Sequence, residues 1–203
     1  MTPAKRALDV VIALCLGLIL LPFLLLVMGV MLIREGRPLF YVSERMKTPT
    51  EGFDLIKLRT MPVNTADGGV TGGNKSAQLS RLHQLLRRSR ADELPQLWNV
   101  LRGDISLVGP RPPVRRYVEA YPDLYRRVLR SRPGITGLAS LHFHAHEEAL
   151  LAACETAAET DAVYRRRCIP RKAKLDLIYQ QRRNLCLDLK LIGQTAAKPF
   201  QGR

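Results

Sequence analysis

The sequence predicts an α-rich α+β protein with an N-terminal re-entrant membrane helix hairpin, a small β-hairpin and several short amphipathic helices at the membrane interface. Three observations support this class. Residues 10–33 are apolar and uncharged, residues 38–61 hold two short strand patterns, and apolar residues recur at helical spacing through much of the remaining chain. The chain has 203 residues and a hydrophobic content of 46%, which is enough for a core. We therefore expect a membrane anchor with basic flanks at residues 1–37 and a cytoplasmic domain at residues 38–203.

Residues 10–33 are long enough to cross a bilayer core of about 30 Å as a helix. No small-residue cleavage site follows them, so a membrane segment is favoured over a signal peptide. Basic residues flank the segment on both sides: Lys5, Arg6, Arg34 and Arg37. Because cytoplasmic flanks of membrane segments are rich in Lys and Arg, both ends are expected in the cytoplasm.

Pro22 lies near the middle of this segment, where its ring and its missing N–H predict a kink. A re-entrant hairpin, which enters and leaves through the same membrane surface, explains both the kink and the two basic flanks. The alternative is a single kinked span that places the rest of the chain outside. At the edge of the segment, Asp9 follows Arg6 by three residues, and this spacing predicts an interfacial ion pair.

Residues 39–42 and 53–56 are apolar-rich runs separated by the polar residues 48–52, a pattern that predicts a β-hairpin. Lys57 and Arg59 alternate with Leu58, so in a strand they would project from one face, either toward a functional site or into solvent. Four glycines between residues 64 and 76 predict a loop that serves as a lid or as a linker.

Short helices are predicted on both sides of the central part of the chain. Leucines at helical spacing predict a helix at residues 79–89, with Arg87 on its outer face. Two further helices are predicted at residues 114–120 and 124–129. Their arginines are candidates for contact with anionic membrane headgroups.

The last third of the chain combines helical patterns with two polar segments. Residues 132–137, with the order RPGITG, predict a turn, and a helical pattern from residue 147 onward is expected to break at Pro170. Three histidines stand at alternate positions: His142, His144 and His146. In a strand they would share one face suited to a transition metal, although a polar segment is the favoured interpretation.

Asp92 and Glu93 form the most unusual polar grouping of the chain. Adjacent residues on a helix differ in direction by about 100°, so the two carboxylates can have different roles. Asp92 precedes apolar residues at helical spacing, which predicts that it caps the following helix and stays ionised near neutral pH. An ionised aspartate can act as a nucleophile toward phosphorus, and Arg111 in the rigid turn 109–112 could hold a phosphate. A capped surface helix without chemistry is the alternative.

Charge and cysteine content indicate the kinds of partner. Lys and Arg number 32 against 18 Asp and Glu, so the formal net charge is +14. Such a surface attracts anions, and nucleic acid, anionic lipid headgroups and phosphorylated substrates all fit. The four cysteines show no paired spacing typical of a metal site, which fits reduced thiols facing the cytoplasm. The composition does not decide whether the chain forms a homo-oligomer.

Residues 92–112, with the order DELPQLWNVLRGDISLVGPRP, closely resemble the signature of the bacterial sugar transferase family. These proteins are monotopic polyprenyl-phosphate phosphoglycosyl transferases. The resemblance extends to KRALD near the start, KLRTM in the predicted hairpin, RPGITGLA, and LDLK near the end. It therefore covers nearly the whole chain.

This resemblance implies that residues 38–203 are a phosphoglycosyl transferase catalytic domain with Asp92 and Glu93 as its catalytic dyad. Asp92 would attack the sugar-linked phosphorus and form a covalent aspartyl phosphosugar intermediate, or act only as a base in a ternary complex. Glu93 would ligate Mg²⁺. The anchor of the family corresponds to the hairpin predicted around Pro22, flanked here by Lys5 and Arg6.

The resemblance also implies that Arg111 and Arg87 bind substrate and that Lys57 and Arg59 lie near the active site. Where many relatives have Ser-Leu before the dyad, this chain has Arg90-Ala91, which adds a charge beside the proposed nucleophile. Two further carboxylates match acidic positions of the family, and pairing with nearby arginines is their alternative role: Asp176 and Asp188.

By the same resemblance, the substrates would be a UDP-sugar and undecaprenyl phosphate, and the products UMP and a polyprenyl diphosphate sugar. The expected location is the cytoplasmic face of the bacterial inner membrane, in contact with anionic lipids and without nucleic acid. Two other classes remain as alternatives. One is a membrane-tethered polybasic binding protein, and the other is an inactive scaffold of a polysaccharide assembly complex.

Overall fold

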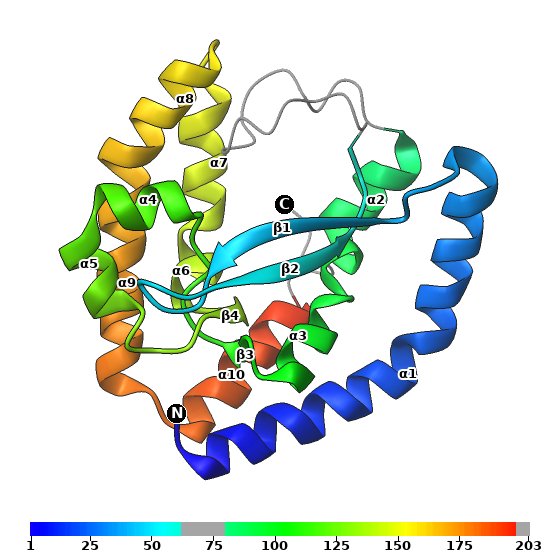
Figure 1. Cartoon of the computed structure of the whole chain (residues 1–203), viewed down its shortest axis with the longest axis horizontal. Coiled ribbons are helices and arrows are strands. Elements are labelled where there is room, and N and C mark those ends of the chain that lie inside the picture. Colours follow the sequence, from blue (N-terminus) through cyan, green and yellow to red (C-terminus); the bar gives the residue numbers. More distant parts are fainter. Residues whose placement is uncertain (62–79, 198–203) are drawn as a thin grey trace.

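The protein is helix-rich, with two small two-stranded sheets (Figure 1). The computed structural model describes residues 1–61 and 80–197. In chain order the elements are α1 (Pro3–Glu35), β1 (Phe40–Met46), β2 (Gly52–Leu58), α2 (Arg81–Ser89), the 3₁₀ helix η2 (Ala91–Glu93), α3 (Gln96–Arg102), β3 (Ser106–Val108), α4 (Arg115–Ala120), α5 (Pro122–Val128), β4 (Gly134–Thr136), α6 (Leu138–His142), α7 (His144–Ala152), α8 (Ala157–Val163), the π-helix η3 (Tyr164–Cys168), α9 (Ile169–Arg182) and α10 (Leu185–Ala197).

Helix α1 is a single bent helix with Pro22 inside it. It begins at Pro3, where the Thr2 side chain accepts a hydrogen bond from the Lys5 N–H, and it ends before Gly36. In Figure 1 the helix runs along the lower edge of the molecule and then turns upward along the right side. Pro22 removes one backbone hydrogen bond and its ring crowds the preceding turn, which accounts for a bend in the middle of the helix.

The two arms of α1 pack against different parts of the domain. Ala13 in the first arm belongs to the main core, which also contains Val100 and Leu191 from the helices on either side. Val27 and Met31 in the second arm pack in a separate cluster with Leu58, Leu86 and Ala91. The second arm therefore supports the segment that carries Asp92 and Glu93.

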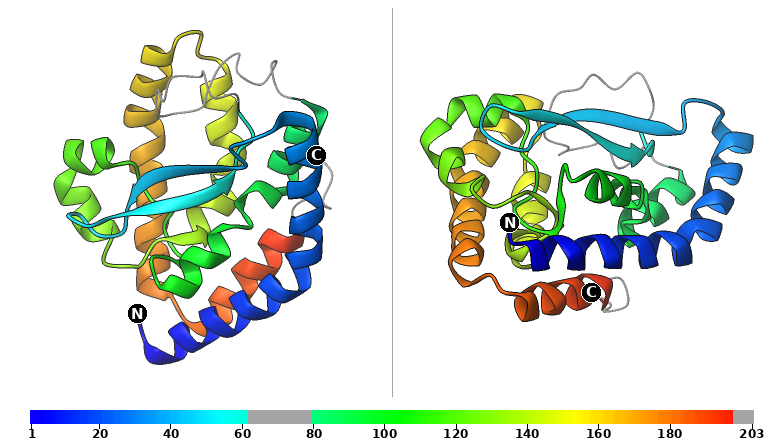
Figure 2. Two further views of the ribbon diagram at one scale, coloured as in Figure 1. Left: turned by 45° about the vertical axis from the view of Figure 1, so that its right-hand side comes forward. Right: turned by 60° about the horizontal axis from the view of Figure 1, so that its bottom comes forward.

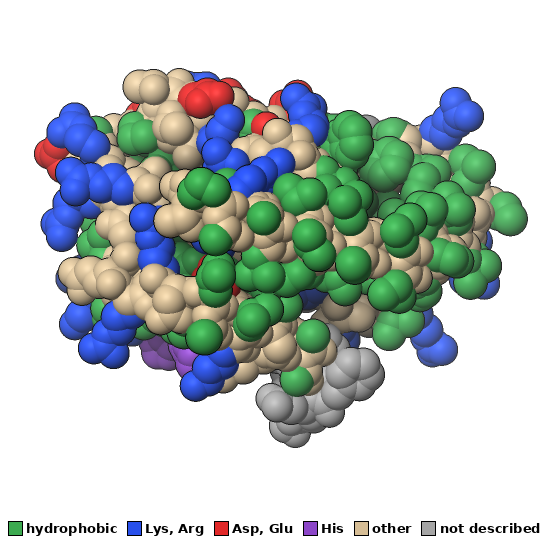
Figure 3. All heavy atoms as spheres, turned by 90° about the horizontal axis from the view of Figure 1, so that it is seen from below, with side chains coloured by type: hydrophobic (Ala, Val, Ile, Leu, Met, Phe, Trp, Pro, Cys, Tyr) green, Lys and Arg blue, Asp and Glu red, His purple; other side chains and the backbone are tan. Residues whose placement is uncertain are grey.

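The outward side of α1 is a broad apolar surface (Figure 3). Its exposed large apolar side chains are Val11, Leu14, Leu18, Ile19, Leu21, Phe23, Leu25, Leu26, Leu32 and Ile33, and Leu185 and Leu189 of α10 are exposed as well. Soluble monomers rarely expose a continuous patch of this kind. Within the described residues, α1 is the helix long and apolar enough to cross a membrane, and this fits membrane association.

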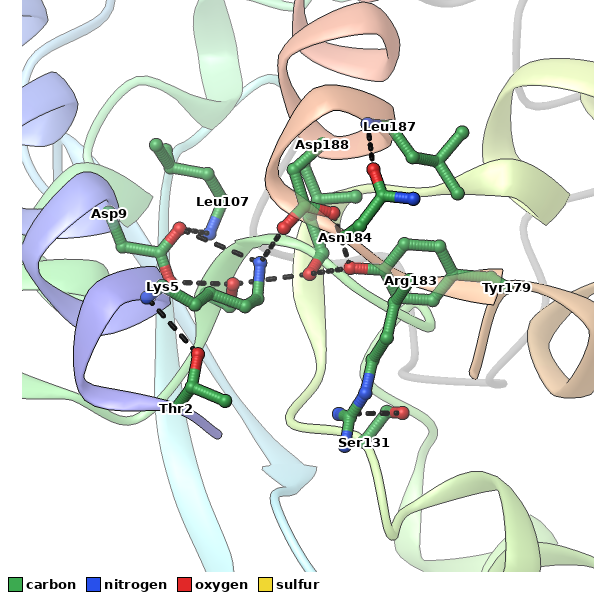
Figure 4. Close-up of polar contacts among 12 residues, drawn as sticks. Thr2, Lys5, Asp9, Leu107, Ser131, Tyr179, Arg183, Asn184, Leu187 and Asp188 are labelled. Carbon is green, nitrogen blue, oxygen red and sulfur yellow. Dashed lines mark hydrogen bonds and ion pairs between the residues drawn. The ribbon is translucent and has the colours of Figure 1, made fainter. Parts of the chain in front are cut away.

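A buried polar cluster fastens the start of α1 to the domain (Figure 4). The Lys5 ammonium lies 2.7 Å from an Asp188 oxygen and 3.8 Å from an Asp9 oxygen. Asp188 also accepts a hydrogen bond from the Tyr179 hydroxyl at 2.6 Å, and Asp9 accepts one from the Ser106 hydroxyl at 2.7 Å. Asp188 thus pairs with a lysine at the other end of the chain.

Arg6 has a different role from the one its spacing predicts. Its guanidinium donates to the carbonyl oxygens of Val100 and Leu101 at 2.6 and 2.8 Å, so it caps the end of α3. The predicted Arg6–Asp9 pair is wrong, because Asp9 faces Lys5 and the backbone of β3 instead. The charged groups of Lys5 and Arg6 therefore both form contacts within the protein.

The predicted β-hairpin is confirmed and is longer than its apolar runs. Strands β1 and β2 pair antiparallel from Phe40 opposite Leu58 to Met46 opposite Gly52. Phe53 and Leu55 are buried, and so the face of β2 that carries them packs on the core. Figure 2 shows the hairpin as one layer above α1 and α3.

The turn predicted at residues 132–137 is wrong in part, because residues 134–136 form β4 and pair parallel with β3. The two backbones approach so closely that a Cβ atom on Gly134 would collide with the backbone nitrogen of Gly109. A Cβ atom on Gly137 would collide with the Gly109 carbonyl oxygen. Glycines at these positions therefore hold the turn that carries Arg111 directly against β4.

The remaining helices follow the predicted patterns with one exception. Helices α2, α4 and α5 form where they are predicted. The break expected at Pro170 is wrong, because α8 continues through the π-helix η3 into α9, and Pro170 occupies the first turn of α9. The glycine-rich loop predicted at residues 64–76 lies outside the described residues.

Candidate active site

Asp92 and Glu93 lie in the 3₁₀ helix η2, between the end of α2 and the start of α3. Arg90 precedes them in the left-handed conformation with φ of 57°. The backbone N–H of Glu93 bonds to the Arg90 carbonyl and that of Leu94 to the Ala91 carbonyl. Helix α3 starts only at Gln96, and no side chain caps it. The predicted capping role of Asp92 is therefore wrong, since the 3₁₀ turn already pairs these backbone donors.

Glu93 is buried and surrounded by cations. Its Oε1 accepts hydrogen bonds from Arg111 at 2.9 Å and from the Lys57 ammonium at 3.1 Å, while Arg90 lies 3.6 Å from its Oε2. Burial alone would raise the pKa of Glu93, but the charges of Arg111, Lys57 and Arg90 outweigh it and hold the pKa well below its usual range. Glu93 is therefore an ionised and firmly positioned carboxylate.

Asp92 has a different environment, although it is the next residue. Its side chain is partly buried and has no hydrogen bond or ion pair to any described residue. Burial and the negative charge of Glu93 raise the pKa of Asp92, against the opposing charges of Lys57, Arg87 and Arg111. The structure thus fixes the Glu93 carboxylate by ion pairs, whereas the Asp92 carboxylate has no such contact with a described residue. Lys57, Arg87 and Arg111 lie close enough for their charges to act on Asp92.

The four predicted cations come from three segments of the chain, and three of the cations interact with the dyad. Lys57 lies near the end of β2, Arg111 in the turn after β3, and Arg87 in the last turn of α2, from which its charge acts on Asp92. Arg59 follows β2, and its backbone N–H donates to the Leu39 carbonyl. Within the described residues, no interaction joins the Arg59 side chain to the dyad.

Asn99 is a positioning residue that the sequence patterns missed. It lies fully buried in α3, where its Nδ2 donates to the Asp54 carbonyl at 2.8 Å and to Asp104 at 3.1 Å. Its Oδ1 accepts the backbone N–H of Ile56 at 3.2 Å, and Ile56 directly precedes Lys57. Asn99 therefore ties β2 to α3 and sets the distance between Lys57 and Glu93. A polar residue among the inward positions of a helix was the available signal.

A second polar cluster on α7 to α9 lies close enough to influence Arg111. Lys172 contacts both oxygens of Glu147 at 3.0 Å and the Tyr164 hydroxyl at 3.3 Å, and its ammonium lies 5.2 Å from the Tyr164 ring centroid. The negative charges of Glu93 and Glu147, together with Tyr164, raise the pKa of Arg111, although burial opposes this. Arg111 therefore stays charged.

The histidine and aspartate candidates lie apart from the dyad. His142 ends α6, whereas His144 and His146 lie in α7, so the three do not share a strand face. No group of three metal-binding side chains occurs in residues 1–61 or 80–197. Asp176 is buried in α9, and burial raises its pKa to about 7.

The dyad does fit one ligand of a hard divalent cation. Glu93 Oε2 is buried and has no hydrogen-bond partner in the described structure, and only the ion pair with Arg90 at 3.6 Å involves it, so it can accept a cation without losing a hydrogen bond. Mg²⁺ commonly uses one or two protein carboxylates and takes its other ligands from water and substrate phosphates. The absence of a three-residue cluster in the described chain is compatible with that mode.

The domain combines two unequal carboxylates surrounded by basic side chains with a large exposed apolar helix surface, which fits an enzyme for anionic substrates that associates with a membrane. The chain belongs to the bacterial sugar transferase family, whose model matches residues 1–202.

Three relatives illustrate the similarity. The exopolysaccharide production protein ExoY of Sinorhizobium fredii is 36% identical over 152 residues, which cover 66% of this chain and 67% of the relative. The UDP-glucose:undecaprenyl-phosphate glucose-1-phosphate transferase of Caulobacter vibrioides is 37% identical over 142 residues, which cover 68% of this chain and 53% of the relative. The enzyme of the same name from Klebsiella pneumoniae is 28% identical over 200 residues, covering 97% of this chain and 40% of its own length.

Proposed function

We propose that the protein transfers a sugar phosphate from a UDP-sugar to undecaprenyl phosphate, giving a polyprenyl diphosphate sugar and UMP. The Caulobacter and Klebsiella relatives are named as UDP-glucose:undecaprenyl-phosphate glucose-1-phosphate transferases, which supports both classes of substrate. The observation that carries the proposal is the contrast within the dyad. Glu93 is clamped by Arg111 and Lys57, while Asp92 beside it has no hydrogen bond to a described residue.

In this mechanism the Asp92 carboxylate attacks the phosphorus that bears the sugar. The bond from that phosphorus to the UMP oxygen breaks, and UMP leaves with the electron pair. An oxygen of the lipid phosphate then attacks the same phosphorus and displaces the Asp92 carboxylate. A raised pKa suits this role, because a less stabilised carboxylate is a stronger nucleophile once it is ionised. Trapping of radiolabelled sugar phosphate on the protein would distinguish this route from one in which Asp92 is only a base.

Three cations would hold the phosphates for this attack. Arg111 is the best placed, because it is already fixed on Glu93 and its planar guanidinium can make two parallel hydrogen bonds to phosphate oxygens. Lys57 and Arg87 act on Asp92 from β2 and α2. Glu93 would hold Mg²⁺ through Oε2. When bound, the ion neutralises charge on the diphosphate.

We propose further that α1 enters and leaves the inner membrane through its cytoplasmic face and that anionic lipids contact the basic residues around it. The bend in α1 and its apolar outer surface support this arrangement (Figures 1 and 3).

The topology of α1 is tested by cysteine labelling. A cysteine introduced before α1 and another at Asp123 should both react with an impermeant reagent from the cytoplasmic side only. The four native cysteines are replaced first. Reaction from opposite sides would show that α1 spans the membrane.

The dependence of kcat/KM on pH should reflect the raised pKa of Asp92. Burial and Glu93 raise the pKa of Asp92, so at a given pH less of the free enzyme holds the nucleophile in its ionised form. The acid limb of kcat/KM should therefore lie above the pKa of an ordinary aspartate, about 3.9. We would measure kcat/KM against pH while monitoring the fold by circular dichroism. A limb at or below the ordinary value would contradict a desolvated Asp92.

The proposed function is tested by release of UMP from a panel of UDP-sugars with undecaprenyl phosphate and Mg²⁺ present. At least one UDP-sugar should give UMP in an amount equal to the lipid-linked product. If no member of the panel gives UMP, the inactive scaffold becomes the better account. UMP release that does not require the lipid would indicate hydrolysis instead of transfer.

A further inference from the structure

Arg45 is a cation close to Arg111, and neither the sequence patterns nor the family motif gave it a role. It lies on β1 opposite Phe53 of β2, and Tyr41 on the same strand lies opposite Lys57. Directly opposed residues of an antiparallel pair point to the same side, and alternate residues of one strand do too. Arg45 and Lys57 therefore share the inner face of the hairpin, together with the buried Phe53.

The turn that carries Arg111 is fixed next to Arg45. The backbone N–H of Met46, the residue after Arg45, donates to the carbonyl of Pro113 at 2.9 Å. Pro113 lies two residues after Arg111. This bond joins the end of β1 to the turn after β3, and it brings the charges of Arg45 and Arg111 close enough to repel.

Arg45 has no carboxylate partner in the described structure. Its one hydrogen bond to a described residue runs from Nε to the Ser43 hydroxyl at 3.4 Å. The neighbouring Glu44 instead pairs with Arg115 at 2.6 Å on the opposite, exposed face of the hairpin. Burial and the positive charge of Arg111 lower the pKa of Arg45, as expected for a guanidinium whose charge is not compensated.

Around the dyad, cations therefore exceed carboxylates. Asp92 and Glu93 interact with four basic side chains: Lys57, Arg87, Arg90 and Arg111. Arg45 adds a fifth positive charge, which acts on Arg111. Lys172 and Glu147 neutralise each other and do not change this balance. Arg111 is paired with Glu93, whereas Arg45 has no carboxylate partner in the described structure. A partly buried guanidinium without a counter-charge is costly unless a ligand supplies the missing negative charge.

We propose that Arg45 and Arg111 form a two-guanidinium clamp for a phosphoryl group of the substrate, an inference that rests on the proposed function. Arg111 binds the group from the side of Glu93, and Arg45 binds it from the inner face of the hairpin. The phosphoryl group belongs either to the diphosphate of the UDP-sugar or to the lipid phosphate. Arg45 is then a substrate-binding residue whose charge is compensated only in the complex.

The clamp is tested by binding of UDP to the purified full-length protein at fixed Mg²⁺, a measurement that needs no turnover. Arg45→Gln should weaken UDP binding by about 10- to 100-fold, the loss expected when charge-assisted hydrogen bonds to phosphate are removed. The melting temperature of the unliganded variant should stay the same or rise, because repulsion from Arg111 is relieved. Arg115→Gln is the matched control, since it removes the same charge from α4, where Arg115 forms an exposed pair with Glu44 of the hairpin, and it should change neither value.

The second substrate separates the two sources of the phosphoryl group. If UDP binding is unchanged but the KM for undecaprenyl phosphate rises by about tenfold or more, the clamp holds the lipid phosphate. The proposal is overturned if neither value changes by more than about twofold. It is also overturned if Arg45→Gln lowers the melting temperature while Arg45→Lys, which keeps the charge but not the planar fork, binds both substrates normally.

Failure of the clamp and failure of the proposed transferase reaction give different results. A wild-type protein that binds UDP through Arg45 but releases no UMP would keep the clamp and reject the transferase reaction. A wild-type protein that turns over while Arg45→Gln binds both substrates normally would keep the reaction and reject the clamp.

Discussion

Asp92→Asn is expected to reduce UMP release by about 10⁴-fold or more while leaving the fold and membrane attachment intact. The amide has the shape of the carboxylate but cannot form the acyl phosphate, and loss of a covalent nucleophile commonly costs several orders of magnitude in rate. The structure gives no reason for a folding defect, because the Asp92 side chain has no hydrogen bond to any described residue. The measurement is UMP release together with the thermal melting curve.

The sign of the stability change follows from the pKa of Asp92. A carboxyl whose pKa is raised on folding favours the folded state only while it is protonated, below its unfolded pKa. At pH 7 it is ionised and opposes folding, so the neutral Asn should leave the protein equally stable or slightly more stable. Asp123→Asn is the matched control, because Asp123 forms an exposed pair with Arg126 far from the dyad. If Asp92→Asn retains more than about a tenth of the activity, a loss below roughly 1.4 kcal/mol, the nucleophile assignment is wrong.

Local patterns predicted the elements whose signals are local. The uncharged apolar run predicted α1, and two apolar-rich runs separated by polar residues predicted the hairpin, because both signals are contained in short stretches of sequence. Pro22 predicted a bend for the same reason. The return of α1 through one membrane surface is a relation to the bilayer and stays a proposal.

The errors arose where a local signal was overruled by packing. Asp92 has the right residue type for a cap, yet a 3₁₀ turn before Pro95 pairs the backbone donors first. The order RPGITG carries turn residues, but positions 134 and 137 require glycine because the backbone of Gly109, just after β3, comes too close for a side chain. Parallel pairing of two segments about thirty residues apart leaves no periodicity in either of them.

The sequence predicts which residues belong to the site, but it does not predict which of them contact one another. Lys57 and Arg111 are predicted candidates because each is a cation in a stretch that resembles the family, whereas their shared contact with one oxygen of Glu93 depends on the tertiary fold. Arg45 was missed because its neighbours Ser43 and Glu44 make the strand look like an ordinary polar edge. Its importance follows from the register of the hairpin and from the bond between Met46 and Pro113.

Glu93→Gln is expected to lower turnover by at least about 100-fold and to destabilise the fold as well. The substitution leaves Arg111, Lys57 and Arg90 around a neutral amide, so the cations lose the charge that positions them. Removing one partner of a buried pair commonly costs about 3–5 kcal/mol, and the partly exposed Arg111 places this site toward the lower end. Because the pKa of Glu93 is lowered, the lost stabilisation is present at neutral pH and would vanish only in strong acid.

The dependence on Mg²⁺ separates metal binding from positioning in this variant. If Glu93 Oε2 holds the ion, the residual activity of Glu93→Gln should need a clearly higher Mg²⁺ concentration for half-saturation than the wild type. An unchanged Mg²⁺ requirement with the same loss of turnover would mean that Glu93 acts only by fixing Arg111 and Lys57. Glu44→Gln makes the same substitution in an exposed pair with Arg115 and should alter neither turnover nor the Mg²⁺ requirement. A positioning role alone would also predict that UDP binding without Mg²⁺ weakens in Glu93→Gln, because Arg111 would no longer be held toward the phosphate.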